Sequence, residues 1–193
     1  MERGRRQADR RFDRVTGTPA RHAVLTGAPG AGKTTLLEAA AAAGIRTSHE
    51  VARTILQRPG GMELRATDPL GFADAMLAAH LEEFAAQADA AGPVVFDRGL
   101  PDVVGFLGVS GLPVSPEIDR ACRAIRYRGP VFRAPAWQAI YRQDAERIQT
   151  LEEAIASDEA VTAAWRRYGY EPIDLPLAKV GERLAFVRQA MGL

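Results

Sequence analysis

The stretch VLTGAPGAGKTTLLEAAAAAG, residues 24–44, decides the fold of this 193-residue chain. It joins an apolar run to a glycine-rich loop and then to a run of alanine and leucine, which favours a helix. Within it, Gly27–Thr34 matches G-x-x-x-x-G-K-[ST], the loop that holds phosphates between a strand and a helix. The chain has 23 arginines but two lysines, and one of the two, Lys33, occupies the lysine position of the motif. The stretch therefore predicts a strand–loop–helix unit that binds a phosphorylated ligand.

Each residue type in this loop has a physical role. Glycines let backbone N–H groups turn inward around phosphates, and the positive end of the following helix adds to their attraction. Lys33 is expected to reach the β- and γ-phosphates, and the Thr34 hydroxyl to bind Mg²⁺. The expected cofactors are ATP (or GTP) and Mg²⁺. The nucleotide-binding residues that we predict are Gly27, Ala28, Pro29, Gly30, Ala31, Gly32, Lys33, Thr34 and Thr35.

Short apolar runs alternate with helical patterns along the rest of the chain. This alternation predicts an α/β fold of the P-loop NTPase type: a five-stranded parallel sheet with helices on both faces and a short lid. The expected strands are 22–26, 45–47, 93–97, 130–132 and 171–176. The expected helices are 32–43, 51–57, 69–90, one starting at 116, 145–168 and 180–191.

Composition narrows the classes of protein. Residues 1–20 are polar and hold six arginines, so we expect a flexible tail before a single domain over 21–193. A net charge of +1 argues against a general nucleic-acid binder, since such domains are strongly basic. No apolar run is long enough to span a bilayer, and the first residues lack the apolar core of a signal peptide. We therefore expect a cytoplasmic protein. We expect it to be a monomer or a homodimer. The single Cys122 is expected to be a buried thiol.

Two acidic side chains are expected beside the loop. Asp97 ends the run VVFD and is followed by Arg98, at the carboxyl end of a strand, where ligands bind in open α/β sheets. Asp97 can bind Mg²⁺, take a proton from an acceptor hydroxyl, or cap the next helix, and Arg98 can contact a phosphoryl group or form a salt bridge. Glu50 follows the second strand and can contact an acceptor hydroxyl or act as its base, with Arg53 on the same helical face. The alternative for Glu50 is a solvated helix start.

A later basic segment, YRQDAER at 141–147, contains Arg142 and Arg147. Such arginines suit a lid that closes over the γ-phosphate, and a solvated helix start is the alternative. Trp137 and Tyr141 are expected to pack in the core or against this lid. The three histidines share no metal-binding spacing, and none is assigned to chemistry.

Several segments together resemble the small AAA-type ATPases with a P-loop kinase-like core. The matching segments are GAPGAGKTTLLEAA, EVAR, DPLGFADAMLAAHLE, VVFDRGLPDVVGFL, PAWQAIYRQDAER and YGYEPIDLP, within residues 21–190. This family is similar to the ribosylnicotinamide kinase domain of the bacterial NAD-regulator protein and to the TRP-translocation-defect GTPases of animals. The resemblance implies a loop at Gly27–Thr34, a strand-end acid at Asp97, lid arginines at Arg142 and Arg147 and, more loosely, an acceptor-side acid at Glu50.

These residues favour a phosphotransferase that moves the γ-phosphate of Mg-ATP to a small-molecule acceptor. The alternative is an ATPase or GTPase switch, or a partner-binding NTPase, in which water is the acceptor. A guanine-reading N-K-x-D motif is absent from the sequence, which disfavours a Ras-like switch. The chain is too short to add the helical lid domain of a ring-forming AAA+ motor. The expected catalytic residues are Lys33, Asp97, Arg98, Glu50, Arg142 and Arg147, with Thr34 and Asp97 at the metal.

Overall fold

The computed structural model describes residues 22–140 and 150–193. Five strands of this part form a single parallel sheet in the order β2-β3-β1-β4-β5. Their bounds are β1 His22–Gly27, β2 Arg46–Thr47, β3 Val94–Asp97, β4 Val131–Ala134 and β5 Ile173–Asp174. The expected five-stranded parallel α/β fold is therefore confirmed.

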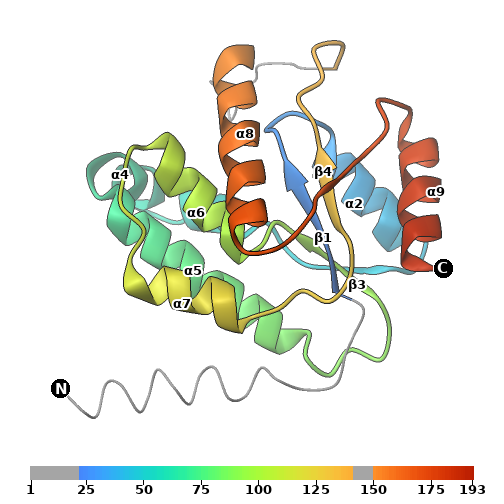
Figure 1. Ribbon diagram of the computed structural model, residues 1–193, viewed down its shortest axis with the longest axis horizontal. Helices are drawn as coiled ribbons and strands as arrows, with labels where there is room; N and C mark the ends of the chain where they lie inside the picture. Colours follow the sequence, from blue (N-terminus) through green and yellow to red (C-terminus); the bar gives the residue numbers. More distant parts are fainter. Residues whose placement is uncertain (1–21, 141–149) are drawn as a thin grey trace.

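Helices cover both faces of the sheet (Figure 1). On one face, α5, α6, α7 and α8 enclose an apolar core that includes Phe96 and the fully buried Trp165. On the other face, α2 and α9 pack against a second core around Leu25 and Phe132. The helix bounds are α2 Lys33–Ala42, α3 Val51–Leu56, α4 Gly61–Thr67, α5 Pro69–Ala86, α6 Leu100–Val109, α7 Pro116–Ala124, α8 Leu151–Arg167 and α9 Val180–Met191.

Local signals explain several helix starts. The Asp68 carboxylate accepts a hydrogen bond from the backbone N–H of Gly71 at the start of α5. The Ser115 hydroxyl does the same for Ile118 in α7, and Thr150 for Glu153 in α8. Each cap satisfies a backbone donor that the helix itself leaves without a partner.

The structure adds two helices that the sequence patterns did not predict, α4 and α6. α6 is apolar nearly all round and is buried between α5 and α8, so it lacks the alternating polar face by which helices are recognised. The helix expected over 69–90 ends at Ala86, which is earlier than predicted. The described part of the helix expected over 145–168 runs from Leu151 to Arg167.

The close packing of β1 and β4 places the glycine-rich loop. Gly27 ends β1 with φ +111°, and a Cβ atom there would lie 2.3 Å from the carbonyl oxygen of Ala134. Only glycine combines this backbone conformation with this close approach. The chain consequently turns directly from the buried strand into the loop that precedes α2.

Candidate functional site

The site lies at the carboxyl ends of β1, β2 and β3, which are neighbours in the sheet. Pairing of β1 with β3 sets Leu25 opposite Asp97, and β2 pairs with β3 through Arg46 and Thr47. The segments after these strands therefore meet at one edge of the sheet. This is the edge at which open α/β sheets bind ligands.

The loop from Gly27 to Gly32 is shaped by three glycines with positive φ: Gly27 at +111°, Gly30 at +75° and Gly32 at +78°. α2 begins at the next residue, so its free N–H groups face the loop. Together these groups have the geometry of an anion-binding turn. The backbone of the loop is thus formed as the motif predicts.

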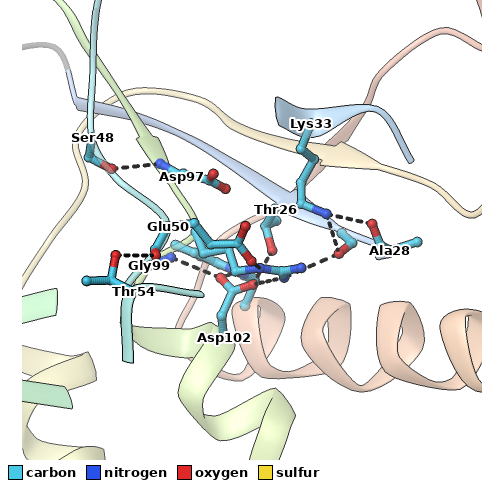
Figure 2. A network of polar contacts seen from close by, with 12 residues as sticks. Thr26, Ala28, Lys33, Ser48, Glu50, Thr54, Asp97, Gly99 and Asp102 are labelled. Atoms are coloured by element: carbon cyan, nitrogen blue, oxygen red, sulfur yellow. Dashed lines mark hydrogen bonds and ion pairs between the residues drawn. The ribbon is translucent and has the colours of Figure 1, made fainter. Parts of the chain in front are cut away.

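Lys33 folds back onto this loop. Its ammonium group is buried and donates hydrogen bonds to the carbonyl oxygens of Ala28 and, at 3.3 Å, of Gly27 (Figure 2). Burial, together with the positive charge of Arg98, lowers the pKa of Lys33 to about 7, although Asp97 and Glu50 oppose the shift. An anion held in the loop would restore the positive charge on this side chain.

Asp97 ends β3 with an unsatisfied carboxylate oxygen. Its backbone N–H donates to the Ser48 hydroxyl at 2.8 Å, but its buried Oδ1 has no hydrogen-bond partner among the described residues. Burial and the negative charge of Glu50 together raise the pKa of Asp97 to about 6, although Arg98 and Lys33 oppose the shift. A buried carboxylate oxygen without a donor is rare, and this oxygen is free to accept a water molecule, a proton or a cation.

Arg98 connects the loop with Glu50. Its backbone has φ +66°, unusual for a residue other than glycine, which marks a constrained position. Its Nη1 lies 2.9 Å from Oδ1 of Asp102 and 3.3 Å from the carbonyl oxygen of Gly27, and its Nε lies 3.7 Å from Oε1 of Glu50. The guanidinium group thus contacts the glycine-rich loop through Nη1 and Glu50 through Nε.

Asp102 is a member of the site that the sequence patterns did not identify. It lies in the first turn of α6, it is buried, and its carboxylate accepts four hydrogen bonds. Figure 2 shows it among the dashed contacts below Thr26 and Gly99. A charged residue directly before the apolar run VVGFL is a signal that could have found it, because a buried carboxylate needs partners.

A cavity of about 330 Å³ opens beside these residues. The residues that line it come from α2, the end of β2, α3 and the end of β3. They are Thr34, Leu37, Glu38, Ala41, Thr47, Ser48, His49, Glu50, Arg53, Thr54, Gln57 and Asp97. The structure thus brings Thr34, Glu50, Arg53 and Asp97 to one cavity.

The structure does not describe every residue that the sequence singled out. Arg142, Arg147 and Tyr141 fall outside the described residues. Trp137 is half-buried, with its ring centroid 5.9 Å from the guanidinium carbon of Arg183. Cys122 is buried in the core as expected, and burial raises the pKa of its thiol to about 12, which suits a packing role.

The oxygen donors at this site suit Mg²⁺. The described residues contain no group of three or more His, Cys, Asp or Glu side chains placed to hold a metal ion. Mg²⁺ in phosphoryl-transfer sites needs no such group, since one carboxylate, a hydroxyl, waters and phosphate oxygens complete its shell. The unpartnered Oδ1 of Asp97 and the Thr34 hydroxyl beside the same cavity fit this pattern.

The chain matches a known protein family over most of its length. A family model described as an AAA domain matches residues 22–183, and the chain belongs to this family. The match covers every element from β1 into α9, including the glycine-rich loop and Asp97. No curated protein matches the sequence.

Solved structures with a similar fold include a deoxyadenosine kinase and a NadR protein. A deoxyadenosine kinase from M. mycoides with bound dATP superposes with a TM-score of 0.66 at 13% identity, over 89% of this chain and all of that one. A NadR protein in complex with NR gives 0.71 at 15% identity, over 95% of this chain and 54% of that one. A NadR protein with NAD and AMP-PNP gives 0.63 at 17% identity, over 95% and 52%. The chain therefore spans about half of the NadR protein.

The class of protein follows from fold and family together. The chain is a P-loop protein of the AAA-domain family, and it has the kinase-like fold of these solved structures. The predicted resemblance to small AAA-type proteins and to the NadR kinase domain is confirmed as well. Across residues 22–140 and 150–193, none of the helices has the length and apolarity of a membrane span.

Proposed function

We propose that the protein is a phosphotransferase that moves the γ-phosphoryl group of Mg-ATP to a hydroxyl group of a small molecule. The observation that carries this proposal is the cavity beside the glycine-rich loop, which Glu50 and Asp97 line. Its volume of about 330 Å³ lies at the lower end of small-ligand sites. An enzyme that activates only water would need no such space next to its catalytic acids.

The residues have distinct roles in this proposal. The loop residues Gly27–Thr35 hold the phosphates, and Lys33 leaves the carbonyl oxygens of its own loop to neutralise the transferring group. Glu50 accepts the proton of the acceptor hydroxyl. The acceptor oxygen then bonds to the γ-phosphorus as the bond to the bridging oxygen breaks, and that oxygen leaves with its electron pair on ADP.

Asp97 and Thr34 are proposed to hold Mg²⁺, which when bound would neutralise phosphate charge. Arg98 stabilises the charge that develops between the loop and the acceptor, from its position beside Glu50 and Gly27. Arg142 and Arg147 are proposed to close over the γ-phosphate. The bound dATP and AMP-PNP of the similar structures support a nucleotide on this fold.

The test is acceptor-dependent turnover. The protein is incubated with Mg-ATP and a panel of nucleosides, sugars and alcohols, and both ADP and phosphorylated product are quantified. We expect at least one acceptor to raise ADP release with equal formation of product. Release of ADP and free phosphate at a rate that no acceptor changes would overturn the proposal in favour of an NTPase with water as acceptor.

A pair of variants tests the assignment of the base. Glu50→Gln should lower kcat for transfer by about 10²-fold, because general-base catalysis contributes at least that much. Glu38→Gln is the matched control, since Glu38 lines the same cavity from α2. Equal losses in the two variants would show that the negative charge of the cavity, and not the position of Glu50, determines the rate.

A further inference from the structure

Asp102 is a buried carboxylate that does not line the cavity but contacts several parts of the site. Its Oδ1 accepts hydrogen bonds from the Thr26 hydroxyl at 2.6 Å and from Nη1 of Arg98 at 2.9 Å. Its Oδ2 accepts from the backbone N–H of Gly99 at 3.0 Å and from the indole N–H of Trp165 at 3.0 Å. These donors belong to β1, to the turn after β3 and to α8.

We propose that Asp102 is a positioning residue that holds the Arg98 guanidinium between the glycine-rich loop and Glu50. The proposal rests on the phosphotransferase function above, because it assigns to Arg98 a role in charge stabilisation. Asp102 acts through Arg98 and touches neither nucleotide nor acceptor. The contact between them joins the Asp102 carboxylate to the Arg98 guanidinium, and each group also has other hydrogen-bond partners.

Three features of Arg98 require such a partner. Its backbone is held in the left-handed region, where its N–H donates to the carbonyl oxygen of Leu25 at 3.0 Å. Its Nη1 is shared between Asp102 and the Gly27 carbonyl oxygen, while the contact of its Nε with Glu50 is longer, at 3.7 Å. Asp102 thus makes the shorter of the two ion pairs, and it is the contact that fixes the guanidinium beside Glu50.

The carboxylate cannot be replaced by an amide without loss. Four donors converge on its two oxygens, and an asparagine has one acceptor oxygen and an NH₂ group that would face two of these donors. A neutral side chain would also leave Arg98 without the nearest compensating charge in a buried setting. Asp102→Asn should therefore release or displace the Arg98 guanidinium, although the two side chains are nearly equal in size.

The expected effect is on kcat. A displacement of a catalytic group by about 1 Å costs on the order of 10²-fold in rate, so we expect Asp102→Asn to lower kcat by about that factor with the KM for ATP nearly unchanged. Asp158→Asn is the matched control. Asp158 is also buried and also paired with an arginine, Arg133, at 2.8 Å, but this pair lies between β4 and α8.

A double-mutant cycle separates positioning from a structural role. Because Asp102 acts through Arg98, Asp102→Asn should cost almost nothing further in an Arg98→Met background. Losses that add in the double variant, or an equal loss of kcat in Asp158→Asn, would overturn the proposal. All rates are compared at a temperature where circular dichroism shows each variant folded.

A second variant keeps the test decisive if Asp102→Asn does not fold. Arg98→Lys retains the charge but cannot bridge Asp102, the Gly27 carbonyl oxygen and Glu50 together, because lysine has one donor nitrogen in place of the planar fork. We expect it to lose about as much kcat as Arg98→Met. Near wild-type turnover of Arg98→Lys would show that the fork held by Asp102 is not needed.

A measurement that needs no turnover distinguishes failure of this inference from failure of the proposed function. In ¹⁵N–¹H spectra the Nη1–H signal of Arg98, assigned by its loss in Arg98→Lys, should be protected from exchange in the wild type and in Asp158→Asn, because Nη1 donates to Asp102. It should broaden or vanish in Asp102→Asn. If no acceptor stimulates turnover but this pattern holds, the phosphotransferase proposal fails alone. An unchanged Arg98 signal in Asp102→Asn overturns the positioning role.

Discussion

Two buried ionisable side chains of the site, Lys33 and Asp97, have pKa values displaced toward neutrality. Burial penalises the charged form of each, Arg98 adds to the shift of Lys33, and Glu50 adds to the shift of Asp97. Such displaced values are common where a site awaits a charged ligand. At this scale the chemistry depends on a few side chains, and single substitutions test it.

Lys33→Met should lower turnover by at least about 10²-fold, because it removes the cation that the loop directs at the phosphates. The fold should persist, since methionine fills a similar volume. Steady-state kinetics and circular dichroism check both parts. Lys179→Met changes the only other lysine of the chain, which is exposed before α9, and it should leave turnover unchanged.

His80 gives a prediction for stability against pH. It is buried on α5, and burial lowers its pKa from 6.5 to about 4. The unfolded chain binds a proton below pH 6.5 while the folded chain does not, so stability is present above pH 6.5 and is lost as the pH falls toward 4. The difference corresponds to about 3 kcal/mol at most.

The measurement is urea unfolding of the wild type and of His80→Leu from pH 7 to pH 4. Subtracting the two curves removes the contribution of Asp97, whose raised pKa acts in the opposite sense over this range. The wild type should lose about 2–3 kcal/mol more than the variant across this range. Parallel curves would contradict the assignment of the shift to His80.

Among the elements, α6 has the strongest influence on the site. It carries Asp102 in its first turn, and it packs along α8, which carries Trp165. The contact is close because Gly105 lets the two helices approach: a Cβ atom there would lie 2.6 Å from Cγ2 of Val161. The position of Asp102 under Arg98 thus depends on how closely these helices pack.

Two glycines of the same helix provide a matched test of this packing. Gly105→Ala should destabilise the protein by about 1–3 kcal/mol, because the added methyl group overlaps Val161 and forces the helices apart. At Gly108 no atom lies within 4 Å of an added Cβ, so Gly108→Ala should stabilise the protein by about 0.5–1 kcal/mol through helix propensity. Urea unfolding measures both, and equal effects of the two substitutions would contradict the packing argument.

Over the whole molecule, distant segments converge on one loop. α9, near the end of the chain, sends Nη1 of Arg183 to the carbonyl oxygen of Ala31 at 2.7 Å. From the other face of the sheet, α6 and α8 fix Arg98, which contacts the first residue of the loop. Figure 1 shows the two faces on which these helices lie, with β1 between them. A ligand held by the loop should therefore stabilise the whole fold.

This expectation can be measured by thermal unfolding with and without Mg-ATP. A ligand at about 1,000 times its Kd stabilises the folded state by about 4 kcal/mol, which raises Tm on the order of 10 °C for a domain of this size. The rise should be much smaller in Lys33→Met. No rise at millimolar Mg-ATP would contradict nucleotide binding by the loop.

The sequence by itself determined the parts whose signals are local. The motif at Gly27–Thr34 predicts its own strand, loop and helix, since the backbone geometry is encoded in adjacent glycines. Alternating apolar and helical patterns predict the parallel sheet, and strand ends predict that Asp97 and Glu50 approach the loop. These predictions need no knowledge of distant contacts.

Only the tertiary structure decided the rest. α6 is apolar nearly all round, so its sequence lacks the polar face by which a helix is recognised, and Asp102 within it has no local motif. Its partners Thr26 and Trp165 lie 76 and 63 residues away along the chain. No local pattern encodes such pairings, because they arise when separate elements pack together and a buried carboxylate must find its donors.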